Sequence, residues 1–175
     1  MAQAEPLHGV FVLERDLEAS PLEIYAAFTD PGLRARWVRL PGKAEAENEY
    51  RSQLGETEVL RSSMRLEDRV EKIERRTRLV DTVPGQRVVF TYEAVVDDVV
   101  RWVSLVAVTL RDAAQGCVLT WTEQYLMLVV TGDGAGDVAH LRGGTELHLN
   151  GLRAVAGGEP SAQPFVVVGP GSRMR

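Results

Sequence analysis

Residues 11–31 read FVLERDLEASPLEIYAAFTDP, a strand followed closely by two helix starts. Apolar and charged residues alternate with a period of two in residues 11–18, which is the pattern of a strand with one buried face. A capping box follows at residues 20–23, where a serine N-cap precedes a proline at the first helical position and a glutamate three residues after the cap. Asp30 and Pro31 repeat the helix-start signal, so the first helix is predicted to be only about two turns long.

The sequence beyond the second helix, which is predicted around Leu33–Val38, is β-like as far as Val130. Pro84-Gly85 is a strong turn dipeptide, and Asp97-Asp98 fits a tight hairpin. Strands joined by such short connections are antiparallel neighbours. The predicted strands are Ala44–Ser52, Glu56–Met64, Arg69–Val83, Arg87–Val96, Val99–Asp112 and Cys117–Val130.

A long helix is predicted at Val138–Ala156, ended by Gly157-Gly158. A helical wheel places His148 at the centre of its apolar side, with Leu141, Leu152 and Val155 on the same side. The glycines within this helix lower its intrinsic propensity, so packing on the sheet must hold it, and they permit a close approach. We therefore predict one domain at residues 1–156 and a flexible, Gly/Pro-rich tail at residues 157–175.

The composition excludes some classes of function. A chain of 175 residues with 45% hydrophobic residues is long enough for one well-packed domain. The net charge of -5 argues against nucleic acid as a partner, and the arginines of the run at residues 75–78 are interpreted as a solvated strand face. The single cysteine, Cys117, suits a reducing compartment, and no leader or membrane span is apparent, which predicts a cytoplasmic protein.

No metal or cofactor is predicted. The three histidines and one cysteine lack the spacing of a metal site. The glycine-rich segment 132–136 lacks the lysine of a phosphate-binding loop and the spacing of a dinucleotide fingerprint. It is interpreted as a connector or a lid.

Three separated parts of the sequence resemble the START-related SRPBCC superfamily, in the branch named for the activator of the heat-shock-protein-90 ATPase. The resemblance covers about residues 9–156, and two positions depart from the pattern. A single glycine, Gly55, stands where the family usually has a pair, and His148 stands where an aliphatic residue is usual. The parts that carry the resemblance are Phe11–Trp37, the run DTVPGQRVVFTYE at Asp81–Glu93, and a third part made of Val106–Leu110, Leu119–Gln124 and Gly144-Thr145.

The resemblance implies an α+β helix-grip fold. In this fold a seven-stranded antiparallel sheet, two short helices and a long C-terminal helix enclose a cavity. Relatives include carriers of lipids and hormones, aromatases and cyclases, and chaperone co-factors. Because one fold carries several functions, the function has to be argued from the site.

Glu123 and His148 are the candidate catalytic residues. Glu123 shares a strand face with Trp121 and Tyr125, where desolvation would raise the pKa of a carboxyl and suit it to acid–base work. His148 faces that strand from the predicted helix, so the two could meet as an acid–base pair. The alternatives are that Glu123 pairs with an arginine at the cavity mouth and that His148 is a hydrogen-bonded structural residue.

Large aromatic side chains are the candidate ligand-binding residues, because ligand pockets are mostly apolar with a few polar groups. Plain core packing is the alternative for each of them. Arg61 and Arg75 could also point inward to bind a carboxylate or phenolate, although surface positions are the expectation for both. The candidate ligand-binding set is Trp37, Phe90, Tyr92, Trp102, Trp121, Tyr125 and Leu141.

The leading hypothesis is a cytoplasmic binding module for a small apolar or aromatic ligand held between the sheet and the C-terminal helix. A cyclase- or hydrolase-type enzyme using Glu123 and His148 in the same cavity is the alternative. A chaperone co-factor, with a chaperone as partner, is a third possibility that follows from the resemblance alone.

Overall fold

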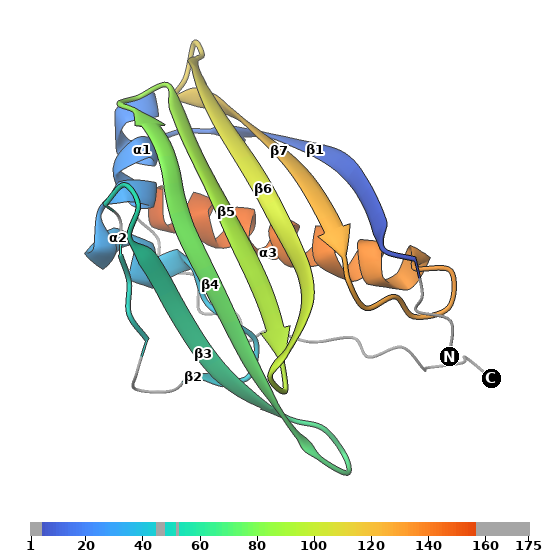
Figure 1. Cartoon of the computed structure of the whole chain (residues 1–175). Coiled ribbons are helices and arrows are strands. Elements are labelled where there is room, and N and C mark those ends of the chain that lie inside the picture. Colours follow the sequence, from blue (N-terminus) through green and yellow to red (C-terminus); the bar gives the residue numbers. More distant parts are fainter. Residues whose placement is uncertain (1–4, 45–47, 52, 157–175) are drawn as a thin grey trace, which may run out of the picture.

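The computed structural model describes residues 5–44, 48–51 and 53–156. It has an α+β architecture with one antiparallel sheet and three helices (Figure 1). In chain order the elements are β1 (Leu7–Leu17), α1 (Pro21–Thr29), α2 (Pro31–Trp37), β2 (Lys43–Ala44), β3 (Thr57–Arg65), β4 (Val70–Val83), β5 (Arg87–Val96), β6 (Val99–Asp112), β7 (Cys117–Met127) and α3 (Ala135–Ala156).

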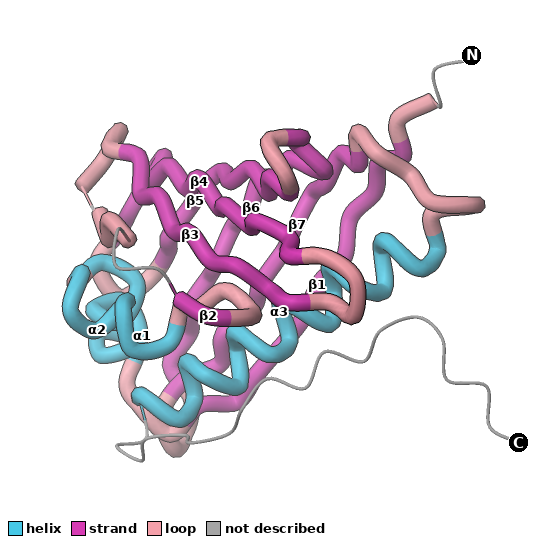
Figure 2. The backbone as a smooth tube through the Cα atoms, turned by 90° about the horizontal axis from the view of Figure 1, so that it is seen from below, coloured by secondary structure: helices cyan, strands magenta, loops and turns pink. Residues whose placement is uncertain are grey.

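The sheet has the strand order β1-β7-β6-β5-β4-β3-β2, with six long strands and the two-residue β2 at one edge. All strand pairs are antiparallel, and β1 closes the other edge by pairing with β7, from Leu7 opposite Met127 to Leu17 opposite Cys117. The three helices lie on the same face of the curved sheet, with α3 running along that face (Figure 2). The predicted architecture of an antiparallel sheet with a long C-terminal helix is confirmed.

Both short helices begin where the sequence predicts. Ser20 and Glu23 form the reciprocal capping box at the start of α1. The Asp30 carboxylate accepts the backbone N–H of Leu33 at 2.8 Å and so caps α2. Local capping chemistry thus fixes the bend between the first strand and the rest of the chain.

The predicted strand Ala44–Ser52 is wrong. In the described residues of that stretch, β2 ends at Ala44 and Glu49 forms only an isolated bridge with Val59. The side chain of Asn48 takes over one ladder position, accepting the backbone N–H of Arg61 at 2.6 Å. Polar side chains that bond the backbone compete with a regular strand in this way.

Two other boundaries differ by about three residues, within the usual uncertainty of element ends. The seventh strand ends at Met127 rather than Val130, and α3 begins at Ala135 rather than Val138. The Asp133 carboxylate accepts the N–H of Ala135 and starts the helix early. The predicted tail, residues 157–175, lies outside the described residues.

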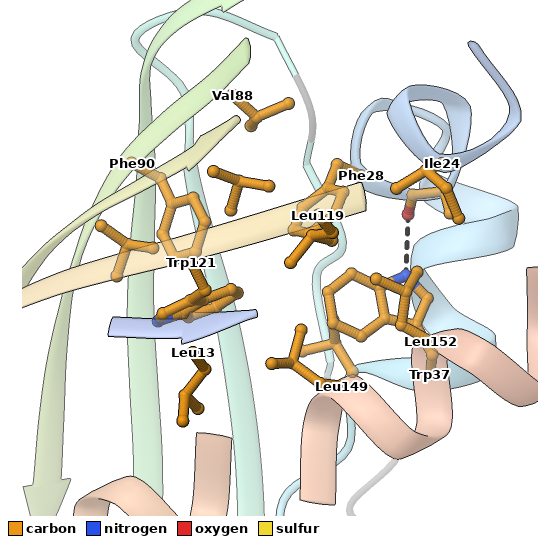
Figure 3. Packing of buried hydrophobic residues seen from close by; sticks show 14 of the residues in the cluster. Leu13, Ile24, Phe28, Trp37, Val88, Phe90, Leu119, Trp121, Leu149 and Leu152 are labelled. Atoms are coloured by element: carbon orange, nitrogen blue, oxygen red, sulfur yellow. Dashed lines mark hydrogen bonds between the residues drawn. The ribbon is translucent and has the colours of Figure 1, made fainter. Parts of the chain in front are cut away.

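The core lies between the sheet and the helices (Figure 3). Phe28 of α1 packs edge-on against Trp37 of α2, with ring centroids 4.9 Å apart, and the Trp37 indole N–H donates to the Ala27 carbonyl at 2.8 Å. On α3, Leu141 and Leu152 are buried as predicted, while Val155 is only half-buried. Leu149 of the same helix is also fully buried.

Candidate functional site

Strand register aligns polar side chains in a row beneath α3. Paired positions run from β3 to β7 across the buried face of the sheet. Apart from Tyr125, which is half-buried, all members of this row are buried. We call this set the polar row, and its residues are Glu58, Thr77, Tyr92, Ser104 and Tyr125.

Glu123 lies next to the polar row and is fully buried. One of its oxygens accepts the Tyr92 hydroxyl at 2.5 Å, and the other accepts the Trp121 indole N–H at 2.9 Å and the Thr145 hydroxyl at 3.2 Å. Burial and the nearby Glu123 carboxylate raise the pKa of Tyr92, so its phenol stays a donor. This carboxylate therefore ties β5, β7 and α3 together.

His148 contacts a buried arginine and a loop carbonyl. Its Nε2 lies 2.9 Å from the Arg39 carbonyl oxygen and its Nδ1 lies 3.4 Å from Nη1 of Arg75. A carbonyl only accepts and a guanidinium only donates, so Nε2 carries the hydrogen and Nδ1 accepts. Burial, followed by the charge of Arg75, lowers the pKa of His148 to about 4, so the ring is neutral at pH 7.

Arg75 is buried, so its predicted position on a solvated strand face is wrong. Strand alternation turns Arg75 and Thr77 inward, while Arg76 and Arg78 are exposed. The Arg75 guanidinium stacks 4.0 Å from the centroid of the Tyr92 ring, and burial lowers its pKa. Within the described part of the chain Arg75 has no ion pair, and its Nε has no hydrogen-bond partner.

A second buried arginine has the partner that Arg75 lacks. Arg34 of α2 donates from Nε and Nη2 to the two oxygens of Glu58, at 2.6 and 2.8 Å. This two-point fork joins α2 to β3 inside the core, the geometry in which arginine binds carboxylates best.

The predicted catalytic pair is drawn together only indirectly. Glu123 and His148 share no direct hydrogen bond in the described part of the chain. They are linked through Arg75, which contacts His148, and Tyr92, which lies against Arg75 and donates to Glu123. In the sequence analysis an inward position of Arg75 is only the alternative to the expected surface position. The alternation of β4 puts Arg75 and Thr77 on one face, and packing determines that this face is the buried one.

The predicted aromatic set is divided between core and margin. Trp37, Phe90, Tyr92, Trp121 and Leu141 are buried, whereas Trp102 and Tyr125 are half-buried. Phe90 and Trp121 meet edge to face, with centroids 5.4 Å apart. Trp102 reaches the polar row, because its indole N–H donates to the Tyr92 hydroxyl at 3.3 Å.

Two hollows are present in the described part of the chain, and of the predicted ligand-binding set only Phe90 lines one of them. A small one of about 10 Å³ touches Phe90, Thr77 and Arg34, enough for about one water molecule. A larger one of about 220 Å³ lies between β3 and the chain around α2. We call it the β3 hollow, and its lining residues are Ala35, Arg39, Leu40, Asn48, Tyr50, Leu60, Arg61 and Ser62.

The β3 hollow adjoins the buried arginine. Leu60 in its wall is the register partner of Arg75 on the neighbouring strand. Arg39 in its wall gives the carbonyl that His148 binds. The hollow and Arg75 are therefore linked through two neighbours, Leu60 and the contact between Arg39 and His148.

None of the helices in the described residues is long and apolar enough to cross a membrane. No cluster of three or more histidine, cysteine, aspartate or glutamate side chains in the same residues could hold a metal ion.

Solved structures share this fold. A protein from Rhizobium leguminosarum is 24% identical, with a TM-score of 0.73 over 89% of this chain and 98% of its own. Mll3558 from Rhizobium loti is 28% identical, with a TM-score of 0.67 over 84% of this chain and 99% of its own. DynU16, from the dynemicin biosynthetic locus, is 20% identical, with a TM-score of 0.56 over 86% of this chain and 48% of its own.

Family comparison agrees with the fold. No curated protein matches the sequence. The sequence model of the family described as "Activator of Hsp90 ATPase homolog 1-like protein" matches residues 18–157, which include every helix and all strands except β1. The chain therefore belongs to the family of activator of Hsp90 ATPase homolog 1-like proteins.

Proposed function

We propose that the protein binds a small, partly apolar or aromatic molecule beside the sheet, between β3 and α2, rather than between the sheet and the C-terminal helix as the sequence predicts. The observation that carries this proposal is unused hydrogen-bonding capacity inside an aromatic core. The Nε of Arg75 and the hydroxyl of Thr77 are buried without partners in the described part of the chain. Buried polar groups are nearly always paired, and pockets combine apolar walls with a few such groups.

The β3 hollow supplies the space for such a molecule. An apolar cavity of about 150 Å³ accommodates benzene, so a hollow of about 220 Å³ has the size for a one-ring molecule. The aliphatic walls Leu40 and Leu60 suit its apolar part. Asn48, Tyr50 and Arg39 offer polar contacts at the same place.

The enzyme alternative stays a prediction. It requires Glu123 and His148 to exchange protons with a substrate. Glu123 already accepts three hydrogen bonds, and both ring nitrogens of His148 are engaged. This arrangement favours a structural role for both residues. The chaperone co-factor alternative draws its support from the family description alone.

Native mass spectrometry of freshly purified full chain tests the binding proposal. We expect a fraction of the protein to carry a co-purified small molecule that is released on denaturation. The naphthalene dye 8-anilinonaphthalene-1-sulfonate should also bind the native protein with a stoichiometry of one. A chain that carries no molecule and does not bind the dye would contradict ligand binding.

A pair of variants on α2 locates the site. Ala35 lines the β3 hollow, whereas its neighbour Arg36 is exposed and does not. Ala35→Phe should fill the hollow and lower dye affinity at least tenfold, while the matched control Arg36→Phe should leave it unchanged. Equal affinity in both variants would place the ligand elsewhere in the molecule.

A further inference from the structure

Two guanidinium groups are buried in the same core with different partners. Arg34 is 5% exposed and Arg75 is 7% exposed, so solvent shields neither of them. Arg34 holds a carboxylate in a two-point fork, whereas within the described residues Arg75 contacts a neutral histidine nitrogen and the face of a tyrosine ring. A buried charge without a compensating partner is costly, which makes Arg75 the group whose pairing is incomplete.

We propose that Arg75 is the anchor for a carboxylate on the ligand, so that the protein binds small aromatic or aliphatic acids in preference to their neutral counterparts. This inference rests on the proposed ligand-binding function and specifies the class of ligand. A carboxylate matches the planar donor fork of arginine, as Glu58 shows on Arg34 in the same core.

Within the described residues, the two carboxylates that act on Arg75, Glu58 and Glu123, are engaged elsewhere. Glu58 gives both oxygens to Arg34, and Glu123 accepts from Tyr92, Trp121 and Thr145. Both carboxylates are nevertheless close enough to favour the charged form of Arg75. Burial lowers the pKa of Arg75, but a guanidinium stays charged at neutral pH, and its Nε has no partner within the described residues.

The contact between Arg75 and His148 is one that a carboxylate can replace. Its length of 3.4 Å is at the long end for a hydrogen bond, and its acceptor is a neutral nitrogen. A carboxylate oxygen would form a shorter, charge-assisted bond with the same donor. The ring would keep its 2.9 Å bond to the Arg39 carbonyl, so a small rotation of the guanidinium is enough.

The position of the β3 hollow agrees with an acidic ligand. Two arginines, Arg39 and Arg61, contribute to its lining, and Arg61 is paired with Glu74 at 2.8 Å. Positive groups at a concave entrance raise the local concentration of anions. An acid whose ring occupies the hollow would have to displace the Leu60 side chain or the His148 contact to reach Arg75.

Benzoate and its neutral isostere benzamide are the probes that separate charge from shape. We expect benzoate to bind the full chain at least tenfold more tightly than benzamide, measured by NMR titration. The Nε–Hε signal of Arg75 should shift on addition of benzoate and stay in place with benzamide. Equal affinities, or an Arg75 signal that benzoate does not move, would overturn the proposal without requiring any variant.

Arg75→Met should abolish the preference for benzoate over benzamide. Arg76→Met is the matched control, because Arg76 is the next residue of β4 on the exposed face. Retained preference for benzoate in Arg75→Met would contradict the anchor role. If both probes bind equally and Ala35→Phe abolishes both, the acid preference fails while ligand binding stands; if neither probe binds, both proposals fail for the β3 hollow.

Discussion

At the scale of single residues, the contacts of His148 determine which of its two predicted roles the structure favours. A histidine on an apolar helix face could be an acid–base catalyst or a structural residue. Its neighbours favour the structural role, because Arg75 contacts one ring nitrogen and the Arg39 carbonyl accepts from the other. The ring is held neutral beside a cation.

This neutrality makes stability depend on pH. The pKa of His148 is about 4 in the folded protein and about 6.5 in an unfolded chain. As the pH falls from 6.5 to 4, the unfolded state gains a proton that the folded state refuses, so the free energy of unfolding decreases over that window and levels off below it. The decrease is at most about 3 kcal/mol, since one pKa unit corresponds to about 1.4 kcal/mol and the ring is only half-buried.

Urea denaturation at pH 7 and pH 4.5 measures this effect. His148→Gln keeps a donor for the Arg39 carbonyl and an acceptor for Arg75, without a group that titrates in this range. We expect the variant to lose less stability than the unchanged protein between the two pH values. Identical losses would show that other groups cause the pH dependence.

At the scale of elements, the glycines of α3 separate into two kinds. The sequence predicted that they allow a close approach, and this is true of Gly151, where an added Cβ would lie 3.3 Å from the Trp37 carbonyl oxygen. At Gly143 and Gly144 an added Cβ would meet nothing within 4 Å. Of these three glycines, only Gly151 is explained by packing between α2 and α3.

Alanine substitutions should therefore have different effects along one helix. Gly144→Ala is expected to stabilise the protein by up to about 1 kcal/mol, because alanine is a better helix former than glycine. Gly151→Ala should give a smaller gain or a loss, since the Trp37 backbone would have to move. Thermal or urea denaturation of the two variants makes the comparison, and equal gains would contradict a tight contact at Gly151.

Contacts with neighbouring elements explain why the short helix α2 keeps its position. α2 has only seven residues, too few to be stable alone. Its Asp30 cap, the Trp37 indole bond to α1 and the Arg34–Glu58 fork to β3 fix it from three directions. Two residues of this anchored helix, Ala35 and Arg34, border the two hollows.

At the scale of the molecule, α3 is held by its buried leucines against the sheet and the short helices. Leu152 is fully buried near Trp37 (Figure 3). Leu152→Ala should lower the free energy of unfolding by about 2–5 kcal/mol, as large-to-small core substitutions do. Leu147, exposed on the same helix, provides the control, because Leu147→Ala should change stability little. A small effect at Leu152 would contradict its central role in the core.

How far the sequence predicts this structure depends on the range of the interactions. Capping at Ser20 and Asp30 and the turn at Asp97 and Asp98, whose φ values are 49° and 65°, are local and were predicted correctly. Strand alternation placed Glu123 inward, where it is fully buried.

Contacts between segments that are distant in the sequence could not be predicted from it. The Arg34–Glu58 fork depends on how α2 lies against β3, and the burial of Arg75 depends on which face α3 covers. The side-chain bond of Asn48 that interrupts the second predicted strand joins two segments of the chain. Periodicity indicates which way a side chain points, and only packing determines what it meets.

The pairing of β1 with β7 has a consequence for synthesis of the chain. Leu7 pairs with Met127, so β1 is synthesised 120 residues before the residue that pairs with its first position. At about 5–20 residues per second, the ribosome needs on the order of 6–24 s to supply it. During that time the apolar face of Phe11, Leu13 and Leu17 has no neighbouring strand on that edge. The hairpins β3–β4, β4–β5 and β5–β6 can form in the meantime. The strand that is synthesised first, β1, therefore joins the sheet after these hairpins.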